Sequence, residues 1–428
     1  MEPRLEKSES YIKSNLSKSN FWNLHLMNIN SAKTFLIITV IIDSMGIGLI
    51  GPVMPALLKE LGNVDVSAAA IWGGLLATSF AFMQFCFGPL LGNLSDSYGR
   101  RPILLISLFV MAIDYVIMGY AASIWILFVG RLIGGMTAAT HSTAMAYMAD
   151  ISKNDEKSQN FGLIGAAFGI GFVLGPLLGG ILGEFSSRAP FYAAALLAFS
   201  NFCLGYFVLP ETVNEKNKRP FKLLRANPFG ALKHLSKIVG VSRLLFILFI
   251  YDIAFYVYPA IWAYWSEERF GWLPIQIGYS FAAFGFCMAI TQGYLMRKII
   301  KYVGERKTVV FALYLNMICF FLIAFASQPW MIWLLIPIIS LGVIAGPALQ
   351  GLMSQAVPDD QQGELQGLLT SIAAIGMIVS PLLMTSTFGF FTGDQTVLYF
   401  PGSPFIISLI LIGFCILLFL KKGNNMRD

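Results

Sequence analysis

The chain has 428 residues, of which 57% are hydrophobic and only 12% are charged, and its mean hydropathy is +0.70. Soluble domains carry about 25% charged residues, so this composition excludes a soluble enzyme and indicates a membrane protein. The net charge of +6 needs no nucleic acid, because basic loops on one side of a bilayer account for it. The five cysteines lie inside apolar runs without metal-ligand spacing, so we interpret them as small buried hydrophobes.

Residues 1–33 are polar and lack the apolar region of a signal peptide, so we expect a disordered cytoplasmic tail. Twelve apolar stretches follow, each long enough to cross about 30 Å of hydrocarbon as a helix. They lie at about 34–58, 68–91, 102–121, 124–149, 160–184, 188–209, 243–265, 275–296, 308–326, 330–353, 364–388 and 402–420. The fold class is therefore an all-α membrane protein with twelve transmembrane helices. We expect an N-terminal six-helix bundle (34–209), a cytoplasmic linker (210–242), a C-terminal six-helix bundle (243–421) and a cytoplasmic tail (422–428).

The distribution of lysine and arginine predicts the orientation of these spans. With the N-terminus inside, 24 basic residues lie in cytoplasmic segments and three lie on the opposite side, namely Lys59, Arg188 and Arg269. Short cytoplasmic loops of membrane proteins carry such an excess of Lys and Arg. We therefore expect a multi-pass protein of the cell inner membrane with both termini in the cytoplasm.

The two halves of the chain resemble each other weakly. A shift of 205 residues carries Gly99 to Gly304, Gly162 to Gly367 and Pro176 to Pro381. Internal repeats related by an axis along the membrane normal are how many transporters build a site near the bilayer midplane. The twelve spans are therefore expected to form two six-helix pseudo-repeats.

The loop between spans two and three, "GNLSDSYGRRP", concentrates charge in a tight turn. Gly92 and Gly99 permit close backbone approach, and Arg100 and Arg101 hold the helix end on the cytoplasmic side. Asp96 contributes little to orientation. We hypothesise that it pairs with basic loop residues and caps a helix of the other half, joining the halves in one state. The alternative is a generic positive-inside turn.

These motifs bear a family resemblance. The loop resembles the G-x-x-x-D-x-x-G-R-R loop of the major facilitator superfamily, and Arg131 with Gly134, Gly135 and Ala139 resembles its R-x-x-x-G motif in span four. "GFVLGPLLGG" (171–180) resembles the G-P-x-x-G-G motif of its proton-coupled antiporters. "DSMGIGLIGPVMPALL" (43–58), "APFYAAALLAFSNF" (189–202) and "EERFGW" (267–272) are similar to the bacterial tetracycline/H⁺ exporters. The resemblance implies the facilitator fold and drug export. In span five, the gating residues it implies are Gly175, Pro176, Gly179 and Gly180.

Few ionisable residues fall inside the spans. The candidates are Asp43 in span one, Asp114 in span three, Arg131 and His141 in span four, and Asp252 in span seven, although a lone helical histidine is more often a structural group. Such groups are expensive in a bilayer, at about 2.5–3.5 kcal/mol for a central Asp, and by default they indicate function. A carboxyl group in water-poor surroundings holds a proton more readily, as proton-coupled exchange requires. The alternatives are structural acids near a membrane edge and, for Arg131, a buried counter-ion.

The chain also departs from the tetracycline-exporter pattern. Asn316 stands where that family often has an acid, Met288 where it has a histidine, and Asp252 where it has a glutamine. We hypothesise that Asp252 partly replaces the missing acid. Gln292 and Asn316 are candidates for hydrogen-bonding a substrate. That family carries tetracycline as a chelate with a divalent cation, so such a cation is an expected part of the cargo.

The sequence therefore predicts a proton-coupled exporter of a drug-like or amphiphilic small molecule that works by alternating access. It is expected to be a monomer in the lipid bilayer, with protons and substrate as partners, no cofactor, no resident metal, no enzymatic activity and no nucleic acid. Proton-coupled uptake of a metabolite on the same fold is the alternative, and a non-transporting membrane receptor is a second.

Overall fold

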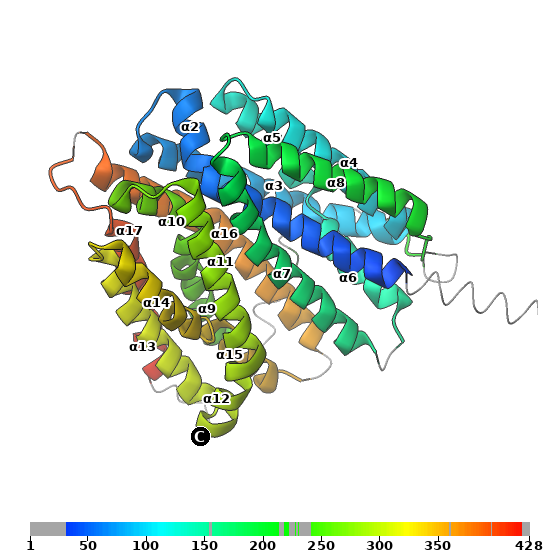
Figure 1. The fold of residues 1–428 in the computed structure, drawn as a ribbon. Helices are drawn as coiled ribbons and strands as arrows, with labels where there is room; N and C mark the ends of the chain where they lie inside the picture. Colours follow the sequence, from blue (N-terminus) through cyan, green and yellow to red (C-terminus); the bar gives the residue numbers. More distant parts are fainter. Residues whose placement is uncertain are drawn as a thin grey trace, which may run out of the picture.

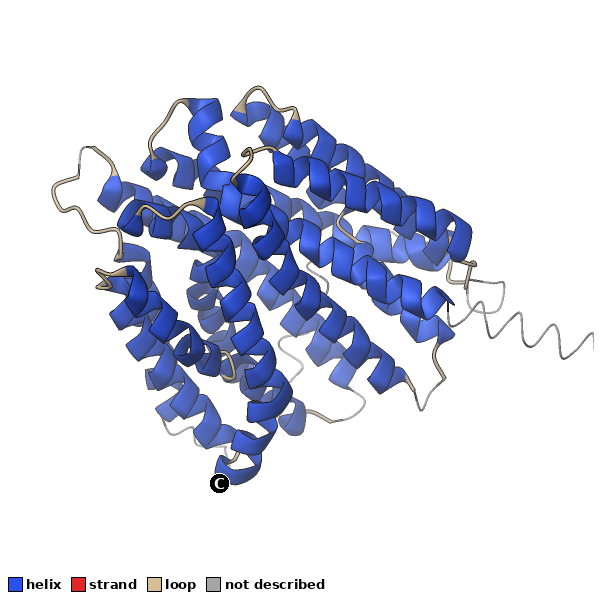
Figure 2. Ribbon diagram, viewed as in Figure 1, coloured by secondary structure: helices blue, strands red, loops and turns tan. Residues whose placement is uncertain are grey.

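The computed structural model describes residues 31–153, 156–213, 218–221, 227, 230, 241–358, 361–394 and 396–421. Most of the expected disordered tail, most of the expected linker and the tail at 422–428 lie outside these residues. Residues 31–33, which we expected in the N-terminal tail, instead begin the helix of span one. Within the described part, every regular element is helical (Figure 2), and twelve helices are long and apolar enough to cross a membrane. The predicted all-α, twelve-span fold class is confirmed.

Seven of the twelve spans are continuous helices and five are interrupted. Span one comprises a helix over residues 31–50, the 3₁₀ turn η1 (Gly51–Val53) and α2 (Met54–Gly62). The next five are α3 (Val66–Tyr98), α4 (Arg100–Gly119), α5 (Ile124–Thr137) with α6 (Thr140–Ile151), α7 (Lys157–Gly183) and α8 (Ala189–Val208). The last six are α9 (Ser242–Phe255) with α10 (Val257–Phe270), α11 (Pro274–Ile290) with the π-helix η4 (Thr291–Leu295) and α12 (Met296–Val303), α13 (Glu305–Ala324), α14 (Pro329–Gly342) with α15 (Ala345–Ala356), α16 (Gln362–Thr392) and α17 (Ser403–Leu420).

The internal repeat is much clearer in the helix boundaries than in the sequence. Adding 205 to the residue numbers of α4, α5 and α6 gives the bounds of α13, α14 and α15 to the residue. Gly99 and Gly304 precede α4 and α13, and both have positive φ, of 122° and 81°. Only glycine adopts these angles without strain, so each helix begins at the same kind of turn. The predicted pseudo-repeat is thus confirmed at the level of the backbone.

The first six and the last six spans pack together closely at one end only. We call this the distal end, and it carries the loops near residues 63–65 and 271–273. The opposite end, which we call the linker end, carries the end of α8 at Val208 and the start of α9 at Ser242. In Figure 1 the two groups meet near α2 and α10 and spread apart towards α6 and α12. The main contacts between the groups are α3 with α16 and α7 with α11.

The surroundings of the glycines along α7 show the same difference between the two ends. A Cβ on Gly180 would lie 2.6 Å from the Pro274 carbonyl oxygen and 3.1 Å from the Gly278 Cα, both on α11. A Cβ on Gly162, Gly165 or Gly169 would meet nothing within 4 Å. The distal half of α7 is therefore pressed against the other half of the protein, whereas the face of its linker half that carries these three glycines is open.

Candidate transport site

Asp114 and Arg131 form a buried ion pair between spans three and four. One Arg131 Nη lies 3.1 Å from Asp114 Oδ2, and the two side chains are 16% and 2% exposed. The guanidinium also lies over the Phe80 ring, 5.0 Å from its centroid. A Cβ on Gly134 would lie 2.5 Å from the Asp114 carboxylate, and one on Gly130 only 2.8 Å from it. The glycines around Arg131 therefore make room for the acid of the neighbouring helix.

Tyr115 extends this pair towards span one. Its ring is 4% exposed, and its phenol lies near enough to Asp43, Asp114 and Arg131 to interact electrostatically with all three. A Cβ on Gly46, one helical turn from Asp43, would lie 2.6 Å from the Tyr115 hydroxyl. Three of the predicted site residues are thus brought together, and Tyr115 is a member that the sequence did not reveal. We call Asp43, Asp114, Tyr115 and Arg131 the charged cluster.

Asp43 differs from Asp114 in having no cation beside it. It is 8% exposed, and its Oδ1 is buried without a hydrogen-bond partner among the described residues. Thr140 lies next to the Asp43 carboxylate at the start of α6, but its buried hydroxyl forms no well-aligned hydrogen bond within the described part. A buried acid without a counter-charge is costly unless it can become neutral, so Asp43 is suited to binding and releasing a proton.

Span four breaks beside the charged cluster. α5 ends at Thr137, and α6 begins at Thr140 after two residues outside the helix. The Ala138 carbonyl that the break releases accepts a hydrogen bond from Gln84 Nε2 on α3 at 3.3 Å. Broken helices at membrane depth are found where backbone lines a site or is held by polar side chains. The break thus brings Thr140 next to Asp43.

Asp252 lies in span seven, just before the break at Tyr256. It is partly exposed, and a Cβ on Gly376 of α16 would lie 3.2 Å from its Cβ. The described neighbours of Asp252 all belong to the last six spans, so the structure does not join it to the charged cluster.

Gln292 and Asn316 occupy contrasting places. Gln292 is exposed on the π-helix η4, beside Gly293, where an added Cβ would meet nothing within 4 Å. Asn316 is fully buried, and its Nδ2 donates to the Gly342 carbonyl at 2.8 Å. Gly342 ends α14, so Asn316 supports the break in span ten as Gln84 supports the break in span four.

The charged loop forms a network at the linker end. Asp96 forms an ion pair with Arg100, and the Asp96 carboxylate also lies 3.9 Å from the Arg219 guanidinium. The Nε of Arg100 lies 3.1 Å from the Asp150 carboxylate. Glu211 accepts hydrogen bonds from the backbone N–H groups of Arg100 and Arg101 at 2.9 and 3.2 Å, which caps the start of α4.

The pairing of Asp96 with basic loop residues is as expected. Its described partners lie in the loop motif and at the start of the linker, and none is a helix of the last six spans. Arg101 instead holds the end of span six, where its Nη2 donates to the Tyr206 carbonyl at 2.7 Å. Gly92 lies open, with nothing within 4 Å of an added Cβ.

The span-five motif "GFVLGPLLGG" packs on two sides. A Cβ on Gly175 would meet the Met45 carbonyl oxygen at 2.5 Å and the Gly48 Cα at 2.9 Å, both in span one. On the other side, Gly180 meets α11, and a Cβ on Gly285 of α11 would lie 2.6 Å from Val173. The small residues thus allow α7 to pack closely between span one and span eight. Gly179 packs against Leu49 of span one, as Gly175 packs against Met45 and Gly48. Pro176 lies between these contacts.

The aromatic residues of span seven form the core of the second half. Tyr258 and Trp262 are 6% and 5% exposed, and Trp265 is fully buried. The Tyr258 ring stacks 5.5 Å from Phe320 and 6.0 Å from Phe284. In this conformation these side chains are packed inside the bundle and face neither lipid nor an open cavity.

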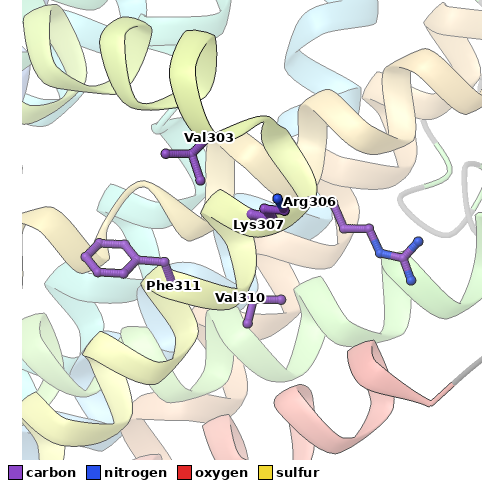
Figure 3. Close-up of a pocket in the computed structure, with 5 residues that line it drawn as sticks. All are labelled: Val303, Arg306, Lys307, Val310 and Phe311. Carbon is purple, nitrogen blue, oxygen red and sulfur yellow. The ribbon is translucent and has the colours of Figure 1, made fainter. Parts of the chain in front are cut away.

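A groove of about 570 Å³ lies elsewhere, at the turn between α12 and α13 (Figure 3). It is lined by Val303, Arg306, Lys307, Val310 and Phe311, and in Figure 3 Arg306 and Phe311 point to opposite sides. No member of the charged cluster lines it, so this surface groove is distinct from the candidate site.

Twelve spans in two repeats, with a broken helix beside buried charges, define the class of this protein: it is a multi-pass membrane transporter of small molecules. The family model described as Major Facilitator Superfamily matches residues 36–381 and 244–425, and the chain belongs to this family. It is therefore a transporter and not an enzyme.

Curated relatives and solved structures agree with this assignment. The chain is 39% identical to the class C tetracycline resistance protein of Escherichia coli, over 85% of this chain and 91% of that protein. It is 38% identical to the class G tetracycline resistance protein of Vibrio anguillarum, over 91% of this chain and 97% of that protein. Among solved structures, a bacterial homologue of the human lysosomal transporter Spinster matches the fold with a TM-score of 0.73, at 15% identity over 92% of this chain and 96% of the other.

Proposed function

We propose that this protein exports a tetracycline-like amphiphilic molecule in exchange for protons by alternating access. The observation that carries the proposal is the charged cluster, in which one acid is neutralised by arginine and a second, Asp43, has no counter-charge among the residues that the structure describes. The tetracycline resistance proteins that the chain resembles over most of its length support the choice of substrate.

The two acids of the cluster have different tasks in this proposal. Asp114 keeps Arg131 in place, because a buried guanidinium never loses its charge and must stay paired. Asp43 alternates between a protonated form and an anion. Its proton is bound from one side of the membrane and released to the other, and substrate binds when the proton has left. Thr140 lies within reach of the Asp43 carboxylate in either form.

Residues 34–209 and 243–421 act as two bundles that rock about this site. The closed distal end and the separated helices of the linker end correspond to a state open towards the linker side. Gln292 lies on the open part of span eight and would contact substrate entering from there. Asp252 supplies a second titratable group from the other bundle. Asn316 contributes by holding the break in span ten.

The environment follows from the distribution of basic residues. The protein resides in the inner membrane as a monomer, with both termini and the linker in the cytoplasm. The open state then faces inwards, and the substrate leaves through the distal end. A divalent cation travels with the substrate as its chelate and is cargo.

Transport in proteoliposomes tests the proposal. Vesicles holding purified protein are loaded with tetracycline and Mg²⁺ and are then diluted into acidic buffer. Protons flowing inwards should drive the drug out, whereas uptake on the same fold would draw external drug inwards. Asp43→Asn should abolish the dependence on the proton gradient, and Asp252→Asn should weaken it.

Asp65→Asn is the matched control. Asp65 caps α3 at the distal end by accepting a hydrogen bond from the Ala68 N–H at 2.9 Å, and asparagine caps equally well. This variant should transport normally. Gradient-driven export that is unchanged in Asp43→Asn would overturn the assignment of the proton site, and no gradient-driven movement in wild type would overturn the function.

A further inference from the structure

Three basic residues lie at the distal end, and each is held differently. Arg188 pairs with Glu60 at 3.1 Å within the first six spans, and Arg269 donates to the Ala326 carbonyl at 2.8 Å within the last six. Lys59, at the end of α2, instead forms an ion pair with Glu267 of α10. Of the three, Lys59 alone joins the two halves.

The Lys59–Glu267 pair lies at the rim of the closed distal end. Beneath it, α7 and α11 approach so closely that a Cβ on Gly180 would lie 3.1 Å from the Gly278 Cα. A second polar contact crosses nearby, where Glu184 Oε1 accepts from the Ile275 N–H of α11 at 3.4 Å. The Glu184 carboxylate therefore lies at the N-terminus of α11, where the helix dipole favours a negative charge. The rim therefore combines close backbone packing with complementary charge.

We propose that the Lys59–Glu267 pair is a latch that stabilises the state with the distal end closed. The proposal rests on the alternating access proposed above. If the two halves separate at the distal end, this pair must break, whereas the Glu60–Arg188 pair moves as part of one half. An interaction made in one state only shifts the balance between the states by its own free energy. Lys59 and Glu267 are thus positioning residues that set how often the distal end opens.

The expected size of the effect follows from exposure. The Lys59 and Glu267 side chains are 35% and 18% exposed, so water and salt screen the pair. Pairs of this kind are weak, and removing one should raise the population with the distal end open about two- to fivefold. The increase should shrink as ionic strength rises, because salt weakens the pair in the parent protein.

A buried reporter at the distal end measures this population directly. Ser67 is 7% exposed at the start of α3, and a Cβ on Gly393, just beyond α16, would lie 3.5 Å from its hydroxyl. Ser67→Cys places a thiol there with little change in volume. Its rate of reaction with a membrane-impermeant maleimide, measured in vesicles, reports opening of the distal end. The parent chain, with its five native cysteines, supplies the background rate.

Lys59→Gln and Glu267→Gln should each accelerate labelling of the reporter about two- to fivefold. The exchanged pair Lys59→Glu with Glu267→Lys should return the rate towards that of the parent. Glu60→Gln is the matched control, since it removes the neighbouring ion pair without touching a contact between the halves. Equal acceleration by Glu60→Gln, or no acceleration by Lys59→Gln, would overturn the latch.

The labelling rate needs no substrate and no proton gradient, so it separates this inference from the proposed function. If the latch is right and proton-coupled export is wrong, the variants still change labelling while tetracycline is not moved by a gradient. If export is right and the latch is wrong, transport proceeds and labelling is the same in all variants.

Discussion

Asp114→Asn should destabilise the protein more than Arg131→Gln does, although both changes break the same ion pair. The pair is shielded from water, with side chains that are 2% and 16% exposed and 3.1 Å apart. Removing one partner of a buried pair costs about 3–5 kcal/mol, because the other charge is left uncompensated. The two orphaned groups differ in how they can respond.

Asp114 without arginine can bind a proton and become neutral, whereas Arg131 without aspartate stays charged. Asp114→Asn should therefore incur the full cost of about 3–5 kcal/mol. Arg131→Gln loses the contact with Phe80 as well, worth about 0.5–2 kcal/mol, but it leaves no obligatory charge. We expect Asp114→Asn to be the less stable variant by about 1–2 kcal/mol, or roughly 1–2 °C in Tm for a chain of this length.

Thermal unfolding of the purified protein in detergent, at one fixed scan rate, measures this difference. The double variant Asp114→Asn with Arg131→Gln should recover part of the loss, because neither charge is then unpaired. Acidic buffer should rescue Arg131→Gln and leave Asp114→Asn unchanged, since only the former depends on protonation. The reasoning is refuted if Arg131→Gln proves the less stable variant, or if the losses of the single variants simply add.

Three other substitutions probe the scaffold. Gly180→Ala should hold the distal end apart, because the added Cβ would lie 2.6 Å from a backbone oxygen of α11. Labelling of a thiol at that end should then be faster. Gly162→Ala, whose Cβ would meet nothing within 4 Å, should leave the labelling rate unchanged. Gly99→Ala should lower Tm by a few degrees, since a φ of 122° costs a non-glycine residue about 1–3 kcal/mol. Asn316→Asp should reduce the yield of folded protein, because it replaces the donor to the Gly342 carbonyl with a buried carboxylate; Asn316→Gln, which keeps a donor, should be milder.

The sequence was sufficient for the twelve spans because length and hydropathy determine what can cross a bilayer. It also identified Asp43, Asp114 and Arg131, since an ionisable residue inside an apolar run is conspicuous. The helix breaks were not predicted. Ala138 carries no local signal such as proline, and the carbonyl freed at its break is held by Gln84, a partner far along the chain. The break at Tyr256 does have such a signal, because Pro259 cannot donate a hydrogen bond to the carbonyl of Phe255, the last residue of α9.

Tyr115 and the Lys59–Glu267 pair were missed for a related reason. A tyrosine in an apolar helix is common, and only packing shows that its hydroxyl meets Gly46 of another span. Lys59 and Glu267 are 208 residues apart, and each reads alone as an ordinary residue at a helix end. Contacts between the halves depend on how two bundles lie together, which periodicity along one helix does not encode.

The repeat conserves the backbone but not the chemistry. α5 and α6 have the same bounds, shifted by 205 residues, as α14 and α15, and both pairs are separated by a two-residue break. The residues that a shift of 205 places opposite Asp114 and Arg131 are Cys319 and Ile336, which are buried and apolar. The break is therefore kept in the second half without a charge beside it, so its place in the fold does not depend on the charged cluster. The charged cluster lies in the first half, so in the proposed mechanism a proton bound at Asp43 would act on the first bundle, and its effect would reach the other through the contacts of α7 with α11 and α3 with α16.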